Sequence, residues 1–477
     1  MSNSRVVKNS IFNVANTLLN ILLPLVTSVY TSRILMPDGI GTLAYVGTVV
    51  SLFASLASLG IPNYGIKIIS LTCNDRNELN KAYTELLLLN TIGTFVVSVF
   101  FIVYVFFFVK DYKVLYFVLG IPLFLNCINV DWYYGGIERY DTVAIRSFII
   151  KCLSVIAMFL FVRTKEDLIK YAIISAAASA LNIVVGFRLA KAKIVFKKLN
   201  LKQHIKPILI LSLTIIFSTI YSKIDIIMLK HMVGENWVGI YSNAHKIVNI
   251  ITSVCTAITA VFLPRISYLY KNDRKEFDAL IAKGLEFLYF ITIPACTGLL
   301  FLAKDLTQVL YGEAFAASAS AMMILSLLIV IQGIGGLTNY QVVICAGKES
   351  VFIPTTIISM LINISVNWLL IPRYNAVGAA VASVLGELFL NVALFIYIHK
   401  TVGFKVRALT LVKCLIADAV MVGAIFAVKW IEMSSLPHCI LVVTVGAAAY
   451  VLVSMVLKNN VLNTLTKAIK ERAGAKH

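Results

Sequence analysis

Charged residues are scarce in this chain of 477 residues, since Asp, Glu, Lys and Arg together make up 14% of it. A soluble globular protein carries about 25% charged residues. Hydrophobic residues make up 60% of the chain, and the mean hydropathy is +0.89. The apolar runs reach about 20 residues without alternating with polar residues, which favours membrane helices over a barrel. We therefore predict an all-α polytopic membrane protein.

Motifs for enzyme chemistry are also absent. There is no His-Glu-x-x-His pair, no Gly-rich phosphate loop and no nucleophile elbow. The connections predicted to lie on the outer side of the membrane are short, so they leave no room for a large external catalytic loop. The 8 cysteines are scattered without paired spacing, which is typical of packing residues rather than of disulfides or a metal site. We predict no enzyme activity, no catalytic residue, no cofactor and no metal.

The net charge of +19 is concentrated in alternate connections between apolar runs. This pattern follows the positive-inside rule and argues against nucleic acid as a partner. It predicts that both termini are cytoplasmic. The longest basic connections, 188–206 and 265–283, are explained by topology and contact with anionic lipid, or alternatively by a specific ligand site. The apolar run from Ile11 is too long for a signal peptide, so we expect a retained first span.

The chain has about 14 candidate spans, each near the ~20 residues needed to cross a bilayer. They lie at 10–34, 40–70, 80–108, 112–134, 141–162, 167–190, 207–233, 237–264, 277–303, 317–346, 351–371, 376–399, 408–431 and 436–458.

An internal repeat relates the two halves of the chain. When Gly41 is placed on Gly239, the polar stripe of the first span, which includes Asn16 and Asn20, falls on that of the seventh, which includes Ser218. We therefore predict two pseudo-symmetric six-helix bundles around a central cavity, at 1–198 and 199–404, with two further helices in 405–477. The paired stripes either line the cavity or serve helix packing.

Two features of the spans predict local geometry. Pro24 lies inside the first span and removes a backbone hydrogen bond, so we expect a kink there. Gly378, Ala382 and Gly386 have small-xxx-small spacing in the twelfth span, which predicts the close approach of a neighbouring helix.

Four stretches carry a family resemblance. They are Asp131-Trp-Tyr-Tyr-Gly-Gly-Ile-Glu-Arg-Tyr140, the corner from Asp225 to Lys246, Leu263-Pro-Arg-Ile-Ser267 and Ile371-Pro-Arg-Tyr-Asn-Ala-Val-Gly-Ala-Ala380. With the span count and the repeat, the chain resembles the O-antigen-type polysaccharide flippases of the multidrug/oligosaccharidyl-lipid/polysaccharide exporter superfamily.

The resemblance implies a function. Such a flippase moves undecaprenyl-diphosphate-linked oligosaccharide repeat units from the cytoplasmic to the outer leaflet of a bacterial cytoplasmic membrane, by alternating access, for surface polysaccharide biosynthesis. Its partners are this substrate and membrane lipids, with proton or sodium coupling. The alternatives are a cation-coupled multidrug exporter, a peptidoglycan-precursor flippase and, from another class, a membrane enzyme. We expect a monomer, because one chain suffices to enclose a cavity.

The corner between the seventh and eighth spans holds three ionisable residues at membrane depth, Lys223, Asp225 and Lys246. At 1.5 Å per residue, Asp225 and Lys246 lie at a similar depth, roughly 12 Å below the surface. We predict that these two pair, which leaves Lys223 for an anionic ligand such as a diphosphate. The alternative is a static network that holds the helices together.

Three further residues are candidates for substrate contact. Lys151 lies inside the fifth span. It either meets an anion, or it is paired within the protein or extends its ammonium group to the membrane surface. Arg139 lies near a span end, where an interfacial anchor is the alternative, as it is for Arg146. Trp132 either stacks on sugar or belongs to the aromatic belt of the membrane interface.

Two carboxylates near the middle of spans, Glu387 and Asp418, are candidates for ion coupling, as is Asp225. The alternative is that both are protonated and hydrogen-bond neighbouring helices. Glu85 lies near a span end, and we expect it to be hydrated. The three buried lysines favour an anionic ligand, and therefore the flippase over the exporter of cations.

Overall fold

The computed structural model describes residues 3–196, 199–260, 262–404, 408–431 and 433–462. The described residues form helices and connecting loops, without a strand. The contacts within the chain divide it into two compact units, Met1–Lys230 and His231–His477. The predicted division at 198 and 404 into two bundles and a helical pair remains a prediction.

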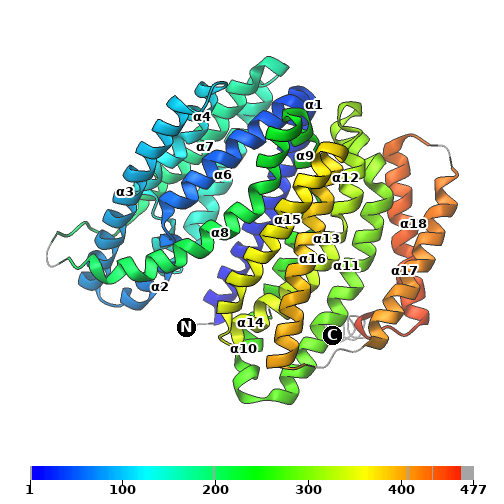
Figure 1. The fold of residues 1–477 in the computed structure, drawn as a ribbon. Coiled ribbons are helices and arrows are strands. Elements are labelled where there is room, and N and C mark those ends of the chain that lie inside the picture. Colours follow the sequence, from blue (N-terminus) through cyan, green and yellow to red (C-terminus); the bar gives the residue numbers. More distant parts are fainter. Residues whose placement is uncertain (1–2, 197–198, 261, 405–407, 432, 463–477) are drawn as a thin grey trace. The chain divides into compact units, whose positions relative to one another are not determined.

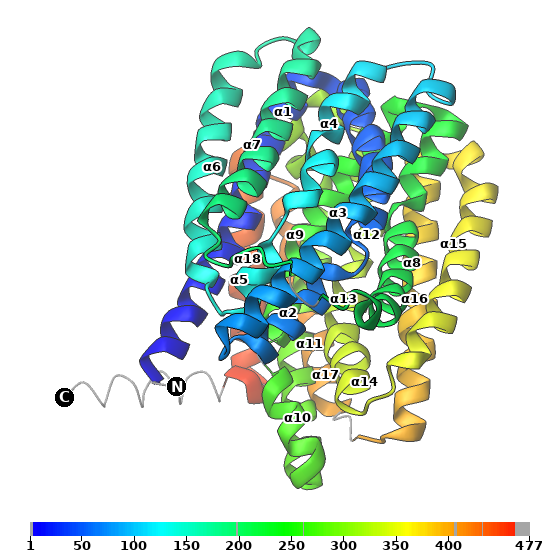
Figure 2. The ribbon, with the colours of Figure 1, turned by 90° about the vertical axis from the view of Figure 1, so that its left-hand side faces the viewer.

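Unit 1 contains the first ten elements (Figures 1 and 2). They are α1 (Asn3–Ser58), α2 (Ile61–Thr72), α3 (Arg76–Phe107), α4 (Lys113–Leu125), η1 (Asn126–Ile128), α5 (Asp131–Gly136), α6 (Tyr140–Phe161), η2 (Lys165–Asp167), α7 (Leu168–Leu189) and α8 (Lys202–Val233), whose last turn passes into unit 2. Helices α1, α4, α6 and α7 pack against one another side by side (Figure 2).

Unit 2 contains the remaining elements. They are α9 (Glu235–Ala260), α10 (Leu263–Asn272), α11 (Arg274–Tyr311), η3 (Glu313–Phe315), α12 (Ser318–Leu325), α13 (Leu327–Gly335), the π-helical η4 (Gly336–Gln341), α14 (Val342–Cys345), η5 (Glu349–Val351), α15 (Phe352–Tyr374), α16 (Ala376–Thr401), α17 (Ala408–Lys429) and α18 (Ser435–Val456). The last two form a hairpin that packs on α11 (Figure 1).

The predicted spans fall on these helices, and the all-α polytopic fold is confirmed. Within the described residues, 11 helical stretches are long and apolar enough to cross a membrane. The first, Leu23–Thr72, contains the predicted span 40–70 and the last part of the predicted span 10–34, whereas Lys113–Ile128 is apolar but shorter. Helix α9 has 26 residues, so its polar composition, rather than its length, keeps it out of this set.

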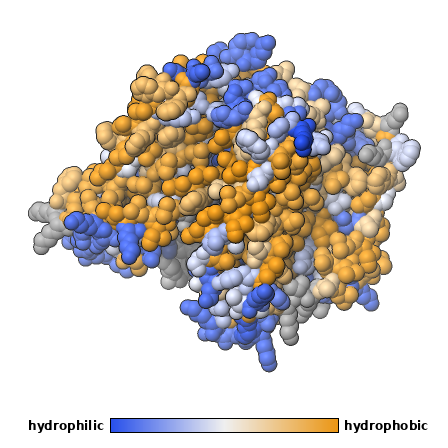
Figure 3. All heavy atoms as spheres, viewed as in Figure 1, coloured by the Kyte–Doolittle hydropathy of each residue, from blue (hydrophilic) through white to orange (hydrophobic). Residues whose placement is uncertain are grey.

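Side chains that face outward are apolar along the middle of the helices. In α3, for example, Phe95, Phe100 and Phe107 are exposed by 69%, 64% and 81%. Figure 3 shows hydrophobic residues over the helix middles of the visible face and hydrophilic residues near the helix ends. Such a surface would be unstable in water, and it matches the hydrocarbon core of a bilayer.

Helix α1 has a break at Met36. Met36 has φ 59° and ψ 173°, and it is the one residue of α1 with non-helical dihedral angles. It precedes Pro37, whose ring disfavours helical geometry in the residue before it. The dihedral angles at Pro24 stay helical, and the kink or loosening expected there remains a prediction.

The small residues of α16 pack as predicted. A Cβ atom on Gly378 would lie 2.5 Å from the carbonyl oxygen of Leu370 in α15. About two turns further along α16, the carbonyl oxygen of Gly386 accepts a 2.7 Å hydrogen bond from the Ser359 hydroxyl of α15. Helices α15 and α16 therefore approach backbone to backbone, which only small residues permit.

Candidate functional site

The corner that joins α8 to α9 is a single residue, Gly234, with φ +95°. On α8, Asp225 is buried with 7% exposure and Lys223 is half-buried. On α9, Lys246 is also half-buried. Lys223 and Asp225 belong to unit 1 and Lys246 to unit 2, so the structure does not test the predicted pair of Asp225 and Lys246. It remains a prediction.

The two lysines at this corner are short of partners. Among the described residues of its own unit, neither Lys223 nor Lys246 has a hydrogen bond or an ion pair from its ammonium group. A cation removed from water without a counter-charge is unfavourable. These two ammonium groups are therefore well suited to receive an anionic ligand.

The polar stripe of α8 uses its hydroxyl groups locally. Ser218 is exposed, and its hydroxyl donates to the carbonyl oxygen of Ile215 at 3.0 Å. Ser222 does the same to the carbonyl oxygen of Thr219, also at 3.0 Å. A serine hydroxyl bonded in this way still accepts hydrogen bonds from a ligand. The side chains of Asn16 and Asn20, which we predicted to match this stripe, lie outside the described residues.

Lys151 and Arg139 occupy different environments in α6. Lys151 lies inside the helix and is half-buried. Arg139 precedes the helix, and its guanidinium contacts Asp141 at 3.1 Å and Thr142 at 3.0 Å on the exposed surface. The structure thus gives Arg139 a local partner in the first turn of α6. The substrate contacts of both residues remain predictions.

Trp132 lies in the core of unit 1 together with Tyr133 and Tyr134, each exposed by 4% or less. A Cβ atom on Gly65 would lie 2.9 Å from the Trp132 ring, and the indole nitrogen donates to the carbonyl oxygen of Asn129 at 3.0 Å. In this conformation the ring supports α2 and α5 rather than presenting a face to a ligand. Its predicted contact with sugar is untested.

Sequence reasoning missed a buried arginine beside this cluster. Arg146 of α6 is 5% exposed, whereas we expected an anchor at the membrane surface. Its guanidinium contacts Asp131 at 2.7 Å and Asn182 at 3.3 Å, and it lies against Gly186 of α7. A Cβ atom at Gly186 would collide with the guanidinium, so the glycine makes the space for the arginine. Gly186 is the feature of the sequence that could have indicated a buried arginine here.

A second missed cluster surrounds Glu85 of α3, which is 1% exposed and was expected to be hydrated. Its carboxylate accepts hydrogen bonds from the backbone of Asn200 at 2.6 Å and from Gln203 at 3.2 Å, and it contacts His204 at 2.9 Å. The other ring nitrogen of His204 contacts the Tyr64 hydroxyl at 2.8 Å. The hydration expectation was wrong because partners more than 100 residues away replace the water.

Glu387 lies beside an irregular helical turn of unit 2. Its carboxylate accepts a 3.2 Å hydrogen bond from the Asn391 amide, and Asn391 in turn accepts from Asn339 of η4 at 3.1 Å. Single π-helical turns occur frequently at functional sites. Glu387 is therefore connected to a segment of uncommon backbone geometry, and its role in ion coupling remains a prediction.

Asp418 joins α17 to α11. Its Oδ2 atom accepts a 2.8 Å hydrogen bond from the Thr297 hydroxyl, and its Oδ1 atom is buried without a hydrogen-bond donor among the described residues. This geometry fits either a protonatable carboxyl group or a helix contact, the two alternatives that the sequence left open.

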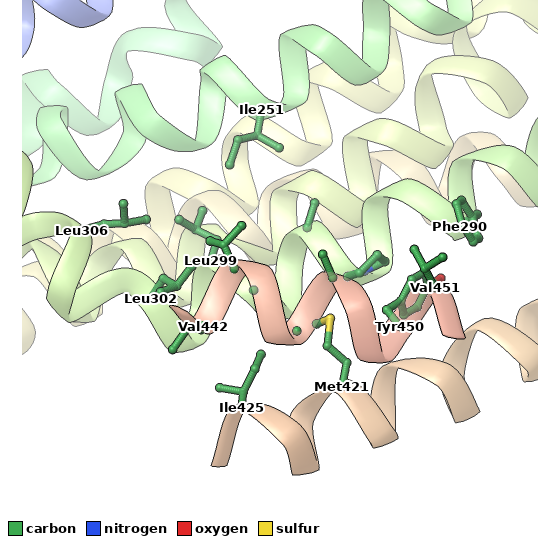
Figure 4. A pocket seen from close by; sticks show the side chains of 16 residues that line it. Ile251, Phe290, Leu299, Leu302, Leu306, Met421, Ile425, Val442, Tyr450 and Val451 are labelled. Atoms are coloured by element: carbon green, nitrogen blue, oxygen red, sulfur yellow. The ribbon is translucent and has the colours of Figure 1, made fainter. Parts of the chain in front are cut away.

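A cavity of about 480 Å³ lies in unit 2 between α9, α11, α17 and α18 (Figure 4). Its walls are hydrophobic and include Phe290, Leu302, Met421 and Tyr450. Since no charged side chain lines it, this cavity does not suit a diphosphate. Within the described residues, no group of three or more His, Cys, Asp or Glu side chains could hold a metal ion.

Comparison with known proteins identifies the family. Residues 6–270 match the model of the family described as "Polysaccharide biosynthesis protein". The chain belongs to this family. The capsular polysaccharide biosynthesis protein CapF of Staphylococcus aureus is 25% identical over 411 residues, which cover 83% of this chain and 100% of CapF. A relative from Shigella dysenteriae, whose name includes the words O-antigen transporter, is 22% identical over 394 residues, covering 80% and 96%.

The fold of this member of the polysaccharide biosynthesis family also has a solved counterpart. The inward closed structure of the lipid II flippase MurJ superposes with a TM-score of 0.71 at 16% identity, and it covers 95% of this chain and 99% of that one. At this level of identity the likeness concerns the fold alone. It agrees with the expectation of an all-α polytopic membrane fold.

Proposed function

We propose that this protein is a flippase for lipid-linked oligosaccharides, which serve as repeat units in the synthesis of a surface polysaccharide. Membership of the polysaccharide biosynthesis family carries the proposal, together with relatives whose names include O-antigen transporter and glycan flippase. The protein is a multi-pass membrane protein of a fold that transporters use.

The charge of the buried groups supports an anionic ligand. Lys151, Lys223 and Lys246 are half-buried inside helices of the predicted spans. A diphosphate would neutralise such cations, and hydrogen bonds between charged groups contribute about 1.5–3 kcal/mol each. An exporter of organic cations would need the opposite arrangement. The proposed ligand is therefore a polyprenyl diphosphate that carries a short glycan.

Several finer features belong to the same proposal. The substrate moves from the cytoplasmic to the outer leaflet of a bacterial cytoplasmic membrane by alternating access, with both termini in the cytoplasm. Asp225, Glu387 and Asp418 are the groups proposed to couple this movement to protons or sodium. The protein works as a monomer and catalyses no covalent step.

The proposal is tested by transport in sealed proteoliposomes. A fluorescent lipid-diphosphate oligosaccharide in the inner leaflet becomes accessible to an impermeant quencher when it is flipped. The wild type is expected to accelerate this exposure over protein-free vesicles, and Lys151→Ala to slow it. An ion gradient would change the rate if transport is coupled. Efflux of a cationic dye without any movement of the lipid-linked glycan would overturn the proposal in favour of a drug exporter.

A further inference from the structure

The segment between α7 and α8 contains no helix or strand in its described residues, yet its backbone is hydrogen-bonded to α3. We call residues 190–196 and 199–200 the strap. The Lys193 backbone N–H donates to the Asn80 side chain at 2.8 Å, and the Val195 N–H donates to Thr84 at 3.0 Å. The Asn200 N–H donates to Glu85, as described above. The acceptors are buried by more than 90%, so the strap is tied to the interior of unit 1 at three points.

The side chains of the strap alternate between the interior and the surface. Ala190 and Ala192 pack against the hydrophobic cluster of unit 1 that contains Trp132. Lys191, which lies between the two alanines, and Lys193, which follows Ala192, are both exposed. Over these four residues the alternation of an extended chain holds, and both lysines lie on the exposed side. The alternation ends at Ile194, which is exposed as well.

The exposed side chains of the strap combine positive charge with apolar groups. Beyond the two lysines, Ile194 and Phe196 are exposed by 48% and 73%. The first turns of α8 add Lys202 and Lys206, both exposed. Among the described residues, none of these four lysines makes an ion pair, and the nearby Glu85 is buried and fully engaged.

We propose that the strap and the first turns of α8 form a preformed docking surface for anionic phospholipid headgroups. The four lysines contact the phosphates, while Ile194 and Phe196 enter the interfacial layer. Each lysine near an anionic membrane surface contributes about 1 kcal/mol. Because α3 already fixes the backbone, binding orders few groups and loses little conformational entropy.

A bilayer surface fits this arrangement better than the diphosphate of a transported substrate. The lysines are spread along an extended, exposed segment, and they do not converge on one enclosed point. Phe196 lies next to them, and exposure of this large apolar side chain to water is unfavourable. Its ring suits the boundary between headgroups and hydrocarbon. The proposal concerns the surroundings of the transporter and does not depend on which ligand it flips.

The experiment is a lipid titration of the purified protein in detergent, in which the thermal unfolding temperature is followed. Phosphatidylglycerol is compared with phosphatidylcholine for the wild type and for a variant with Lys191, Lys193, Lys202 and Lys206 each changed to Gln. The matched control has the same change at four exposed lysines of unit 2 that lie outside the basic connection 265–283, namely Lys304, Lys348, Lys400 and Lys458.

For the wild type and the control, phosphatidylglycerol is expected to raise the unfolding temperature more than phosphatidylcholine does. The strap variant should need at least about tenfold more phosphatidylglycerol for the same shift, because four contacts of about 1 kcal/mol each are lost. A variant with the same four lysines changed to Arg should behave like the wild type, which separates lost charge from damaged folding.

Two results would overturn the proposal. One is an equal response to phosphatidylglycerol in the strap variant and the control. The other is abolition of the lipid effect by micromolar inorganic diphosphate at constant ionic strength, which would identify the strap as an entry site for a diphosphate ligand instead. Loss of the effect when salt is raised from 0.1 to 1 M is expected, since screening at 1 M acts within about 3 Å.

Discussion

Two polar regions of unit 1 lie within apolar helices but are built differently. Around Glu85, a carboxylate, an imidazole and a phenol contact one another and the backbone of the strap, and all three residues are buried. Along the later half of α8, Ser218 and Ser222 bond only to carbonyl groups of their own helix, and Lys223 is half-buried. The first region is saturated with partners, whereas the second retains hydrogen-bonding capacity.

This difference separates structural polarity from functional polarity. A buried polar group that has all its partners stabilises one arrangement, and removing a partner leaves a desolvated charge. A polar group with unused capacity contributes little to folding and remains available to a ligand. Substitutions in the first region should therefore affect stability, and those in the second region should affect transport.

The largest effect is expected for Glu85→Ala. The substitution leaves the Asn200 N–H and the His204 ring without their acceptor, and each buried donor left unsatisfied costs about 1–3 kcal/mol. Denaturant unfolding in detergent measures the change. Glu78, which is exposed on the same helix, provides the control, because Glu78→Ala should change stability by less than about 0.5 kcal/mol. Equal losses for the two variants would contradict the assignment of Glu85 to a structural network.

The next effect compares two arginines that sequence reasoning placed together at the membrane surface. Arg146→Ala removes a buried guanidinium that links α5, α6 and α7, and we expect a loss of about 2 kcal/mol. Arg139→Ala removes an exposed pair with Asp141, for which a loss below about 1 kcal/mol is expected. Thermal unfolding of both variants tests the ranking, and the reverse order would show that burial does not determine their contribution.

Lys223→Ala tests the second region directly. If the ammonium group forms a hydrogen bond between charged groups with the ligand, the flipping rate should fall about 10–100-fold. Stability should hardly change, and Lys223→Arg should retain most of the activity. Lys67, an exposed lysine of α2, supplies the control for the loss of one positive charge. A loss of stability as large as that of Glu85→Ala would place Lys223 with the structural residues instead.

The smallest effect is expected for Ser218→Ala. One neutral hydrogen bond to a ligand contributes about 0.5–1.5 kcal/mol, which corresponds to a decrease in flipping of roughly 2–10-fold. Ser212 of the same helix is buried, with its hydroxyl bonded to Ile208 at 2.7 Å, so Ser212→Ala should leave flipping unchanged. The proteoliposome assay compares the two, and identical rates would remove Ser218 from the predicted cavity lining.

Local patterns in the sequence predicted the helices well. Hydropathy located the spans because each must bury about 20 apolar residues in lipid, and this requirement is independent of tertiary contacts. The spacing of Gly378 and Gly386 predicted the close contact of α16 with α15 for a similar reason, since small side chains act at their own position. The break at Met36 also follows a local pattern, because Pro37 comes directly after it and disfavours helical geometry there.

The polar networks were less accessible to prediction. Glu85 and His204 are 119 positions apart, and nothing near either residue in the sequence indicates the other. Arg146 was assigned to the surface by its distance from a span end, but the space next to Gly186 allows it to lie in the interior. Whether Lys223, Lys246 and Asp225 meet a ligand depends on contacts that only a bound substrate would reveal.

The strap has a consequence for the synthesis of this protein. Asn80, Thr84 and Glu85 of α3 are made long before Lys193, Val195 and Asn200, which satisfy them. During translation, α3 therefore leaves the ribosome with polar groups whose partners do not yet exist. Until the strap emerges, these groups need water or an insertion factor, and the first unit cannot close. We therefore expect the first half of the nascent chain to become a stable folding unit only after the strap has emerged.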